Sequence, residues 1–380
     1  MNSMRFRRQT VPSLALVVLL LFTACGGDDG DNTTNPFQPP VKPPTPVIAL
    51  VANQASNNVS AYTINASTGA LAPVSGSPFS VGGTTPVGMT IASDGTLAYV
   101  ANQGSHNVSA FAVDPPTGRL TVVAGSPFSA GTTPFRIAMS PNRSFLYVTN
   151  QGSNNISAYA IGAAGSLTPI TGSPFAAGFT PAGVTCSPNG SFLYVANQGS
   201  NDISGYTINA AGQLSPVAGS PFAVGTTPVG VVVSPDGSFL YVSNQGSNYV
   251  SALAIDVLTG ALTPVTGSPF ATGITPAGIT ISPNGSFLYV ANQSTNNVSA
   301  FAVNAGTGAL APVGSPSPSG TTPTAVTVSP DGGFLYVANQ GSNDVFAYSI
   351  NNASGVLTGV SGSPFPAGVT PRAIATPGHP

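Results

Sequence analysis

Short apolar stretches alternate with polar turns along residues 47–376, and the same arrangement recurs seven times. In the unit that begins at Pro181, the apolar segments are 181–187, 192–197, 203–208 and 213–217, separated by Gly, Pro, Asn and Ser. Runs of this length, rich in β-branched and aromatic residues and bounded by turn formers, predict strands. None has the periodicity of an amphipathic helix. We therefore expect an all-β chain with four strands in each repeat.

One asparagine closes the second strand of every repeat and gives the repeat length. The seven copies are Asn53, Asn102, Asn150, Asn197, Asn244, Asn292 and Asn339, at intervals of 47 to 49 residues. A fixed period of this size is typical of solenoids, propellers and arrays. Four strands in one such unit match a propeller blade, so the repeat predicts a seven-bladed β-propeller of four-stranded antiparallel blades.

The two ends of the repeat region complement each other. The first repeat begins at residues 47–51, which correspond to the second strand of a blade. The missing first strand has its counterpart at residues 371–376, which align with residues 134–139. The C-terminal strand is therefore expected to complete the N-terminal blade, because this removes an exposed strand edge. The propeller would span residues 47–376, with residues 377–380 as a tail.

Two further residue types recur in the repeats, and both have structural explanations. A proline opens each first strand, where its missing N–H is tolerated: Pro86, Pro134, Pro181, Pro228, Pro276, Pro323 and Pro371. A phenylalanine of the linker is expected to wedge between neighbouring blades: Phe79, Phe128, Phe175, Phe222, Phe270 and Phe365. Ser317 replaces it in the sixth repeat, so the wedge is absent there.

Residues 1–24 have the features of an export signal. Three arginines precede an apolar run at 14–22, which is too short to span a bilayer and suits a cleaved signal. The run ends in Leu-Phe-Thr-Ala-Cys, which resembles a bacterial lipobox except at Phe22. We predict that Cys25 is lipidated and anchors the protein at the cell envelope, facing the periplasm or the surface. Ordinary secretion with an unmodified Cys25 is the alternative.

Residues 25–46 are rich in Gly, Asp and Pro and predict a semi-extended tether. The chain has 8 basic and 10 acidic residues, all of the acids being Asp, and loss of the signal leaves five bases. This balance excludes a polybasic nucleic-acid or lipid surface, so membrane contact is expected through the lipid alone. The second cysteine, Cys186, occupies an apolar repeat position and is expected to be buried. We expect no metal, no cofactor and a monomer.

Departures from the repeat are the candidates for chemistry, because the repeated residues are explained by the scaffold. Arg136 stands where other repeats have glycine, and Arg372 where they have a small residue such as Ala182. Both begin first strands, which line the channel of a propeller, so both are expected near its mouth. His106 replaces an asparagine in a loop on the same face. The turn residues Asp94, Asp236 and Asp331 lie on the opposite face and are interpreted as turn formers.

Arg136, Arg372 and His106 on adjacent blades form a candidate site. The arginines would hold a carboxylate or lactone carbonyl, and His106 would act as general base. Five loop residues are added as candidate binding residues: Asp202, Asn102, Gln103, Asn150 and Gln151. The structural alternative is that the arginines fill the channel and bond to backbone carbonyls, with His106 farther out on its loop.

The segment Tyr147-Val148-Thr149-Asn150 is the signature of YVTN-repeat propellers. With Ser-Pro-Asp/Asn-Gly followed by Phe-Leu-Tyr-Val, it resembles the seven-bladed lactonase family, which includes 6-phosphogluconolactonases and carboxymuconate cyclases. The resemblance covers residues 47–376 and implies a seven-bladed fold. It also implies His, Arg and Glu groups at the channel mouth. This chain has no Glu, and its other histidine is His379, so no catalytic set transfers.

Two functions follow from these patterns. The first is a non-catalytic, envelope-anchored propeller whose Asn-, Gln- and Ser-rich face binds a protein or a glycan. The alternative is a hydrolase of the lactonase family that acts on a small lactone at Arg372, His106 and Arg136. A quinone-dependent propeller is disfavoured, because the chain has no Trp and no calcium-ligand cluster.

Overall fold

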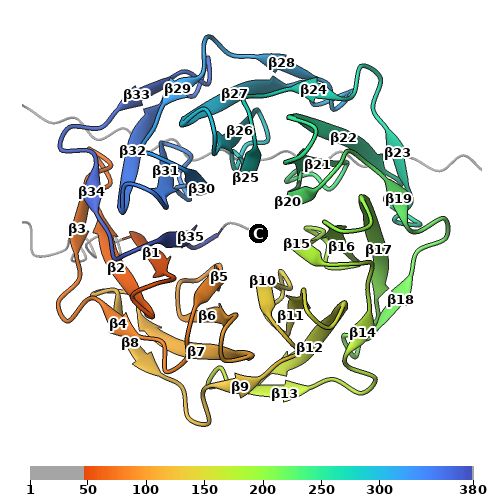
Figure 1. Cartoon of the computed structure of the whole chain (residues 1–380), viewed down its shortest axis with the longest axis horizontal. Coiled ribbons are helices and arrows are strands. Elements are labelled where there is room, and N and C mark those ends of the chain that lie inside the picture. The colour runs from red at the N-terminus through yellow and green to blue at the C-terminus, as the bar shows by residue number, and fades with distance from the viewer. Residues whose placement is uncertain (1–46, 379–380) are drawn as a thin grey trace, which may run out of the picture. The chain divides into compact units, whose positions relative to one another are not determined.

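The computed structural model describes residues 47–378, which form seven antiparallel sheets arranged in a ring (Figure 1). The predicted signal, Cys25 and the tether lie outside these residues, as do His379 and Pro380. No helix occurs within 47–378, and hence none there that could cross a membrane. The predicted all-β, seven-bladed propeller is confirmed.

Each blade contains an innermost strand at the channel, two further long strands, and two short strands at its outer edge (Figure 1). The innermost strands are β5 (Pro86–Ile91), β10 (Pro134–Met139), β15 (Pro181–Cys186), β20 (Pro228–Val233), β25 (Pro276–Ile281), β30 (Pro323–Val328) and β35 (Pro371–Ala375). The second strands are β1 (Val47–Asn53), β6 (Leu97–Asn102), β11 (Phe145–Asn150), β16 (Phe192–Asn197), β21 (Phe239–Asn244), β26 (Phe287–Asn292) and β31 (Phe334–Asn339).

The outer strands complete the blades. The third strands are β2 (Asn58–Ile64), β7 (Asn107–Asp114), β12 (Asn155–Ile161), β17 (Asp202–Ile208), β22 (Tyr249–Ile255), β27 (Asn297–Val303) and β32 (Asp344–Ile350). The fourth are β3 (Leu71–Pro73), β8 (Arg119–Val122), β13 (Leu167–Pro169), β18 (Leu214–Pro216), β23 (Leu262–Pro264), β28 (Leu310–Pro312) and β33 (Leu357–Gly359). The fifth are β4 (Phe79–Ser80), β9 (Phe128–Ser129), β14 (Phe175–Ala176), β19 (Phe222–Ala223), β24 (Phe270–Ala271), β29 (Ser317–Pro318) and β34 (Phe365–Pro366).

The fifth strand is a correction to the four-stranded blade expected from the sequence. β18 covers only the far end of β17, from Tyr206 to Ile208. The near end would keep unpaired backbone groups, which are costly where they are buried. Residues of the linker fill this position, with Phe222 opposite Ile203 and Ala223 opposite Asp202. The linker is thus partly a strand.

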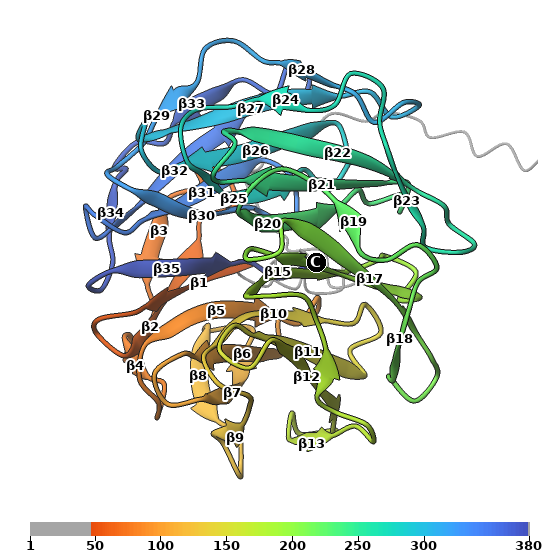
Figure 2. The ribbon, with the colours of Figure 1, turned by 45° about the vertical axis from the view of Figure 1, so that its right-hand side comes forward.

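The ring closes as the sequence predicts. β35 pairs antiparallel with β1, placing Ile374 opposite Val51, so the last strand completes the first blade (Figures 1 and 2). We number the blades from this closure: blade 1 contains β35 and β1–β4, blade 2 contains β5–β9, and so on to blade 7. Closure pairs the inner edge of the first blade and removes a template for aggregation.

The core lies between the blades rather than within one of them. Tyr147 of blade 3 has no exposed surface, and its hydroxyl donates to the carbonyl of Gly212 in blade 4, at 3.0 Å. Phe175 packs against an apolar cluster that contains Ile156 of blade 3 and Leu193 of blade 4. The predicted wedge is therefore confirmed. Cys186 belongs to the same cluster, and burial raises the pKa of its thiol to about 12.

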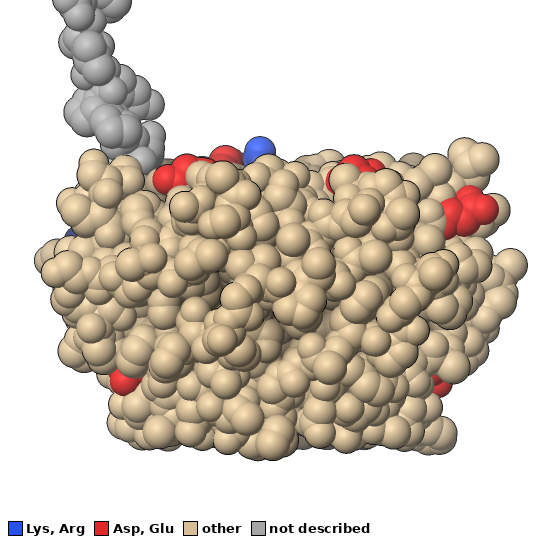
Figure 3. Space-filling view, turned by 90° about the horizontal axis from the view of Figure 1, so that it is seen from above, with Lys and Arg blue, Asp and Glu red and all other residues tan. Residues whose placement is uncertain are grey.

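The register defines two faces. Pro181, Asn197, Asp202 and Ala223 lie at the same end of blade 4, so the linkers and the loops after the second strands share one side, the loop face. The turns that join the first and second strands, such as Ser187-Pro188-Asn189-Gly190, lie at the other end of the blade, which we call the turn face. Among the described residues, this turn face carries five acids, Asp94, Asp114, Asp236, Asp256 and Asp331, against two at the loop face. Figure 3 shows acidic side chains gathered along one side of the propeller.

Candidate functional site

The channel opens on the loop face into a cavity of about 260 Å³. Its wall comes from the first residues of the innermost strands and from the residues that follow the second strands. The lining residues are Gln103, Phe135, Arg136, Gln151, Gln198, Val229, Gln245, Ala277, Gln293, Thr324 and Arg372. The cavity therefore lies where the sequence analysis placed the two arginines.

Glutamines form an incomplete ring at the rim of this mouth, where five of them line the cavity and Gln340 accepts a hydrogen bond from Arg372. In every repeat a glutamine follows the asparagine of the second strand: Gln54, Gln103, Gln151, Gln198, Gln245, Gln293 and Gln340. Each backbone is held by the neighbouring linker, as where Gln151 N–H donates to the carbonyl of Thr133 at 3.0 Å. Neighbouring amides also bond to each other, for example Gln245 Nε2 to Gln293 Oε1 at 2.9 Å. The ring presents neutral donors and acceptors, which suit the hydroxyl groups of a sugar.

The two arginines meet inside this ring. Arg136 Nη1 donates to the carbonyl of Val87 at 2.7 Å and to that of Arg372 at 3.3 Å. Its guanidinium carbon lies 5.0 Å from the centre of the Phe135 ring. Arg372 Nη1 donates to Gln340 Oε1 at 2.8 Å, while its Nε is buried and has no hydrogen-bond partner. Each guanidinium has five N–H donors, so several remain for a ligand.

This mouth is electropositive. Burial, together with the positive charge of Arg372, lowers the pKa of Arg136 to about 10, and burial also lowers the pKa of Arg372. Both remain charged at neutral pH. Within residues 47–378 the one salt bridge joins Arg143 to Asp94 on the turn face. Two partly buried cations without a carboxylate partner form a site that favours an anion.

His106 lies elsewhere. It is exposed, adopts a left-handed backbone with φ of 57°, and its Nδ1 accepts a hydrogen bond from Thr133 N–H at 3.0 Å. Asn154 and Asn201 occupy the same loop position and accept the same bond through their amide oxygens, at 2.8 Å. His106 thus replaces an asparagine in a structural role and is not among the residues that line the cavity.

Of the five loop residues proposed for binding, only Gln103 and Gln151 line the cavity. Asn102 and Asn150 are completely buried, and each amide donates within its own blade, as Asn150 Nδ2 does to Ser157 at 2.9 Å. Asp202 accepts from Asn197 Nδ2 at 2.6 Å. The structure therefore brings together the arginines and the glutamines. It places the asparagines, Asp202 and His106 in the scaffold.

The other lining glutamines, Gln198, Gln245 and Gln293, and Thr324 were not predicted from the sequence. The signal was present, because the Asn-Gln pair recurs in all seven repeats, but its regularity was interpreted as scaffold. The lining residues include no His, Asp, Glu or Cys. The cavity wall therefore supplies positive charge and neutral amides, and it contains no side chain that ionises near neutral pH.

Comparison with known proteins agrees with this architecture. The family model of the lactonase, 7-bladed beta-propeller, matches residues 49–135, 126–229, 220–326 and 315–376. No curated protein matches the chain. Among solved structures, the periplasmic gluconolactonase of Pseudomonas aeruginosa aligns at 22% identity with a TM-score of 0.75, covering 88% of this chain and 99% of that one.

Two Bacteroides proteins, both provisionally assigned as 6-phosphogluconolactonases, give similar alignments. The protein of B. fragilis has a TM-score of 0.78 at 22% identity, covering 89% of this chain and 99% of its own. That of B. uniformis has a TM-score of 0.77 at 22% identity, covering 87% and 99%. At this identity the structural likeness shows the fold alone. The family model, which spans nearly the whole propeller, shows that the chain belongs to the lactonase family of seven-bladed β-propellers.

Proposed function

We propose that this protein is a lactone hydrolase that binds an oxidised sugar at the loop-face mouth of its channel. The observation that carries the proposal is the meeting of Arg136 and Arg372 in a cavity ringed by glutamine amides, without a carboxylate among the lining residues. Membership of the lactonase family supports the class of reaction. The gluconolactonase of Pseudomonas aeruginosa shares the fold and supports the class of substrate indirectly.

The chemistry of lactone hydrolysis matches what this mouth offers. Water or hydroxide attacks the lactone carbonyl, and negative charge develops on its oxygen in the tetrahedral intermediate. Free N–H groups of Arg136 and Arg372 would stabilise that charge, and one such donor is typically worth a factor of about 10² to 10³ in rate. The same groups would hold the carboxylate of the product. The glutamine amides would bind the ring hydroxyls and orient the lactone.

A second candidate function rests on a different observation. The cavity wall has no group that could act as a general base near neutral pH, and such a base commonly contributes a factor of about 10² to 10⁴. A site without one is suited to binding without turnover. The protein would then be a binding module for an acidic sugar or glycan. For either function we also propose export and lipidation at Cys25, which place the site at the cell envelope.

The two functions are separated by measuring turnover and binding on the same protein. Hydrolysis of glucono-δ-lactone is followed by pH-stat, and gluconate binding by calorimetry, for the wild type and for Arg136→Gln with Arg372→Gln. Arg119→Gln, an exposed change on β8, is the matched control. A loss of hydrolysis of about 100-fold in the double variant supports the hydrolase. Weakened gluconate binding, with hydrolysis at the rate of protein-free buffer in every sample, supports the binding module and refutes the hydrolase.

A further inference from the structure

The channel has two chemically different ends, separated by an apolar waist. One residue from the middle of each innermost strand lines the cavities on both sides of this waist: Met89, Ile137, Val184, Val231, Ile279, Val326 and Ile374. A charged or strongly polar ligand held at the loop-face mouth would lose its hydration in passing this ring, which is costly. The far end of the channel therefore differs from the loop-face mouth in the chemistry of its walls.

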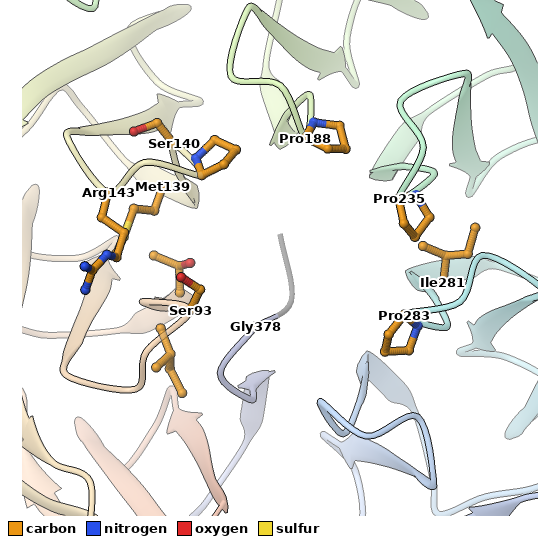
Figure 4. Close-up of a pocket in the computed structure, with 12 residues that line it drawn as sticks. Ser93, Met139, Ser140, Arg143, Pro188, Pro235, Ile281, Pro283 and Gly378 are labelled. Carbon is orange, nitrogen blue, oxygen red and sulfur yellow. The ribbon is translucent and has the colours of Figure 1, made fainter. Parts of the chain in front are cut away.

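That far end is a cavity of about 270 Å³ on the turn face (Figure 4). Its walls are largely apolar, with Ile91, Met139 and Ile281 on the strands and four turn prolines around them: Pro141, Pro188, Pro235 and Pro283. Each proline packs against the turn glycine of the next blade, so that a methyl group added at Gly237 would lie 3.8 Å from Pro188 Cδ. The prolines are thus held rigidly by the repeat.

The proline ring is interrupted in blade 1, where Gly378 stands at the proline position, and between blades 2 and 3. Ser93 stands at the proline position, and Arg143 stands at the position of the glycine that would pack against it. Arg143 keeps the left-handed backbone of that glycine, with φ of 59°, which is unfavourable for a side chain of this size. Its guanidinium forms a salt bridge with Asp94 of the neighbouring turn. Both members of the Pro-Gly contact are therefore replaced together.

This double replacement places the hydroxyl of Ser93 in a largely apolar wall, whose other polar lining side chains are Thr90, Ser140 and Arg143. Ser93 is exposed, and Figure 4 shows it on the same side of the cavity as Met139 and Arg143. The hydroxyl of Ser140 is already bonded to Asn142 Oδ1, at 2.7 Å. No hydrogen bond of Ser93 is found within residues 47–378. An apolar pocket with one or a few polar groups is the usual form of a small-molecule site.

We propose that the turn-face cavity is a second binding site, for a neutral and largely apolar molecule that carries one hydroxyl or carbonyl group. The size follows from volume: a dry cavity of about 150 Å³ holds benzene, so this cavity suits a molecule of two fused rings. Neutrality follows from charge and desolvation. Asp94 pairs with Arg143, and the other acids of the turn face repel anions. A cation would lose hydration that the largely apolar wall does not replace. The polar group of the ligand would bond to Ser93. This inference is independent of the proposed lactone chemistry.

2-Naphthol is the probe, because it is neutral at pH 7, has two fused rings and one hydroxyl, and is fluorescent. Titration of the purified protein should saturate with Kd of about 1 mM or tighter, as expected for a ligand of this size. 2-Naphthoate, which is anionic, should bind this cavity at least about 10-fold more weakly. Ser93→Pro restores the proline of five other turns and removes the hydroxyl, and should weaken 2-naphthol about fivefold. Met139→Trp fills the cavity and should weaken it more than about 10-fold.

Arg136→Gln, which changes the other end of the channel, is the control and should leave the Kd of 2-naphthol unchanged. The strand content and melting temperature of each variant are measured first. Ser93→Pro is expected to fold because five other turns carry proline there, at Pro141, Pro188, Pro235, Pro283 and Pro330. The inference is overturned if binding does not saturate below about 5 mM. It is also overturned if both folded turn-face variants keep the wild-type Kd, or if only Arg136→Gln weakens binding.

Discussion

Replacing Arg136 by glutamine should change stability and ligand binding in opposite directions. The pKa of Arg136 is lowered to about 10 by burial and by the charge of Arg372. A pKa lowered this far means that holding the charge in the folded protein costs about 3 kcal/mol. Because the arginine is protonated in both the folded and unfolded states below pH 10, the full cost applies throughout the neutral range and is relieved only at higher pH.

Arg136→Gln removes that cost but also weakens the hydrogen bond to Val87, worth about 1 kcal/mol. The free energy of unfolding at pH 7 should therefore rise by about 1–2 kcal/mol. Gluconate should bind about 10- to 100-fold more weakly, since a charge-assisted bond contributes about 1.5–3 kcal/mol. Unfolding by urea and calorimetric titration measure the two quantities. A variant that loses 2 kcal/mol or more of stability and keeps its gluconate affinity would refute the reasoning, because the arginine would then be structural.

Three further predictions concern groups in different parts of the chain. His106→Ala should leave the pH-rate profile of lactone hydrolysis unchanged. The rate should rise steadily from pH 6 to pH 9 in both proteins, because no group of the cavity wall ionises in that range. An inflection near pH 6.5 that the variant abolishes would instead identify a general base. Stability should fall steeply above pH 10, because burial raises the pKa of six tyrosines that ionise near 10 when unfolded, and each contributes about 1.4 kcal/mol per pH unit. Tyr147→Phe should reduce this slope by up to about 1.4 kcal/mol per pH unit in urea unfolding at pH 10 to 11, and an unchanged slope would contradict the burial argument. Cys25→Ser should release the exported protein from the membrane fraction and abolish the mass increase of a lipid, as fractionation and mass spectrometry can show; membrane retention of the variant would exclude the lipid anchor.

The scaffold of this protein was predictable because it is repeated. A residue that the blades require recurs in most or all of them, seven times for Asn150 and six for Phe175, so both can be recognised as structural. The closure was predictable because a blade without its inner strand is an incomplete unit. The fifth strand was missed because two residues are too few to carry a period. β18 is shorter than β17 and leaves one end of β17 without a partner. This mismatch, which only the structure shows, explains why two linker residues pair with β17.

The site was predictable only in part, because a residue that is not required in every blade can be recognised only where it interrupts the repeat. Arg136 and Arg372 were identified because they interrupt the repeat, and the fold brings them together across the closure. His106 also interrupts it but keeps the hydrogen bond of the asparagine it replaces, so its difference in sequence is not a difference in local structure. Gln103 and Gln151 were predicted, but the other glutamines of the rim were overlooked because they never vary. Regularity in sequence does not separate a residue that supports the ring from one that the ring presents to a ligand.

The sequence by itself determined the number of blades, the order of their main strands and the place of closure, because these depend on periodicity and on the pairing of strand edges. Only the tertiary structure decided which side chains share a cavity. That depends on the direction in which each residue leaves its strand around a common axis. Gln103 and Gln293 are 190 positions apart yet line one mouth, while Asn102, next to Gln103, is sealed inside its blade. The channel, with its electropositive mouth and apolar far end, is a property of the closed ring.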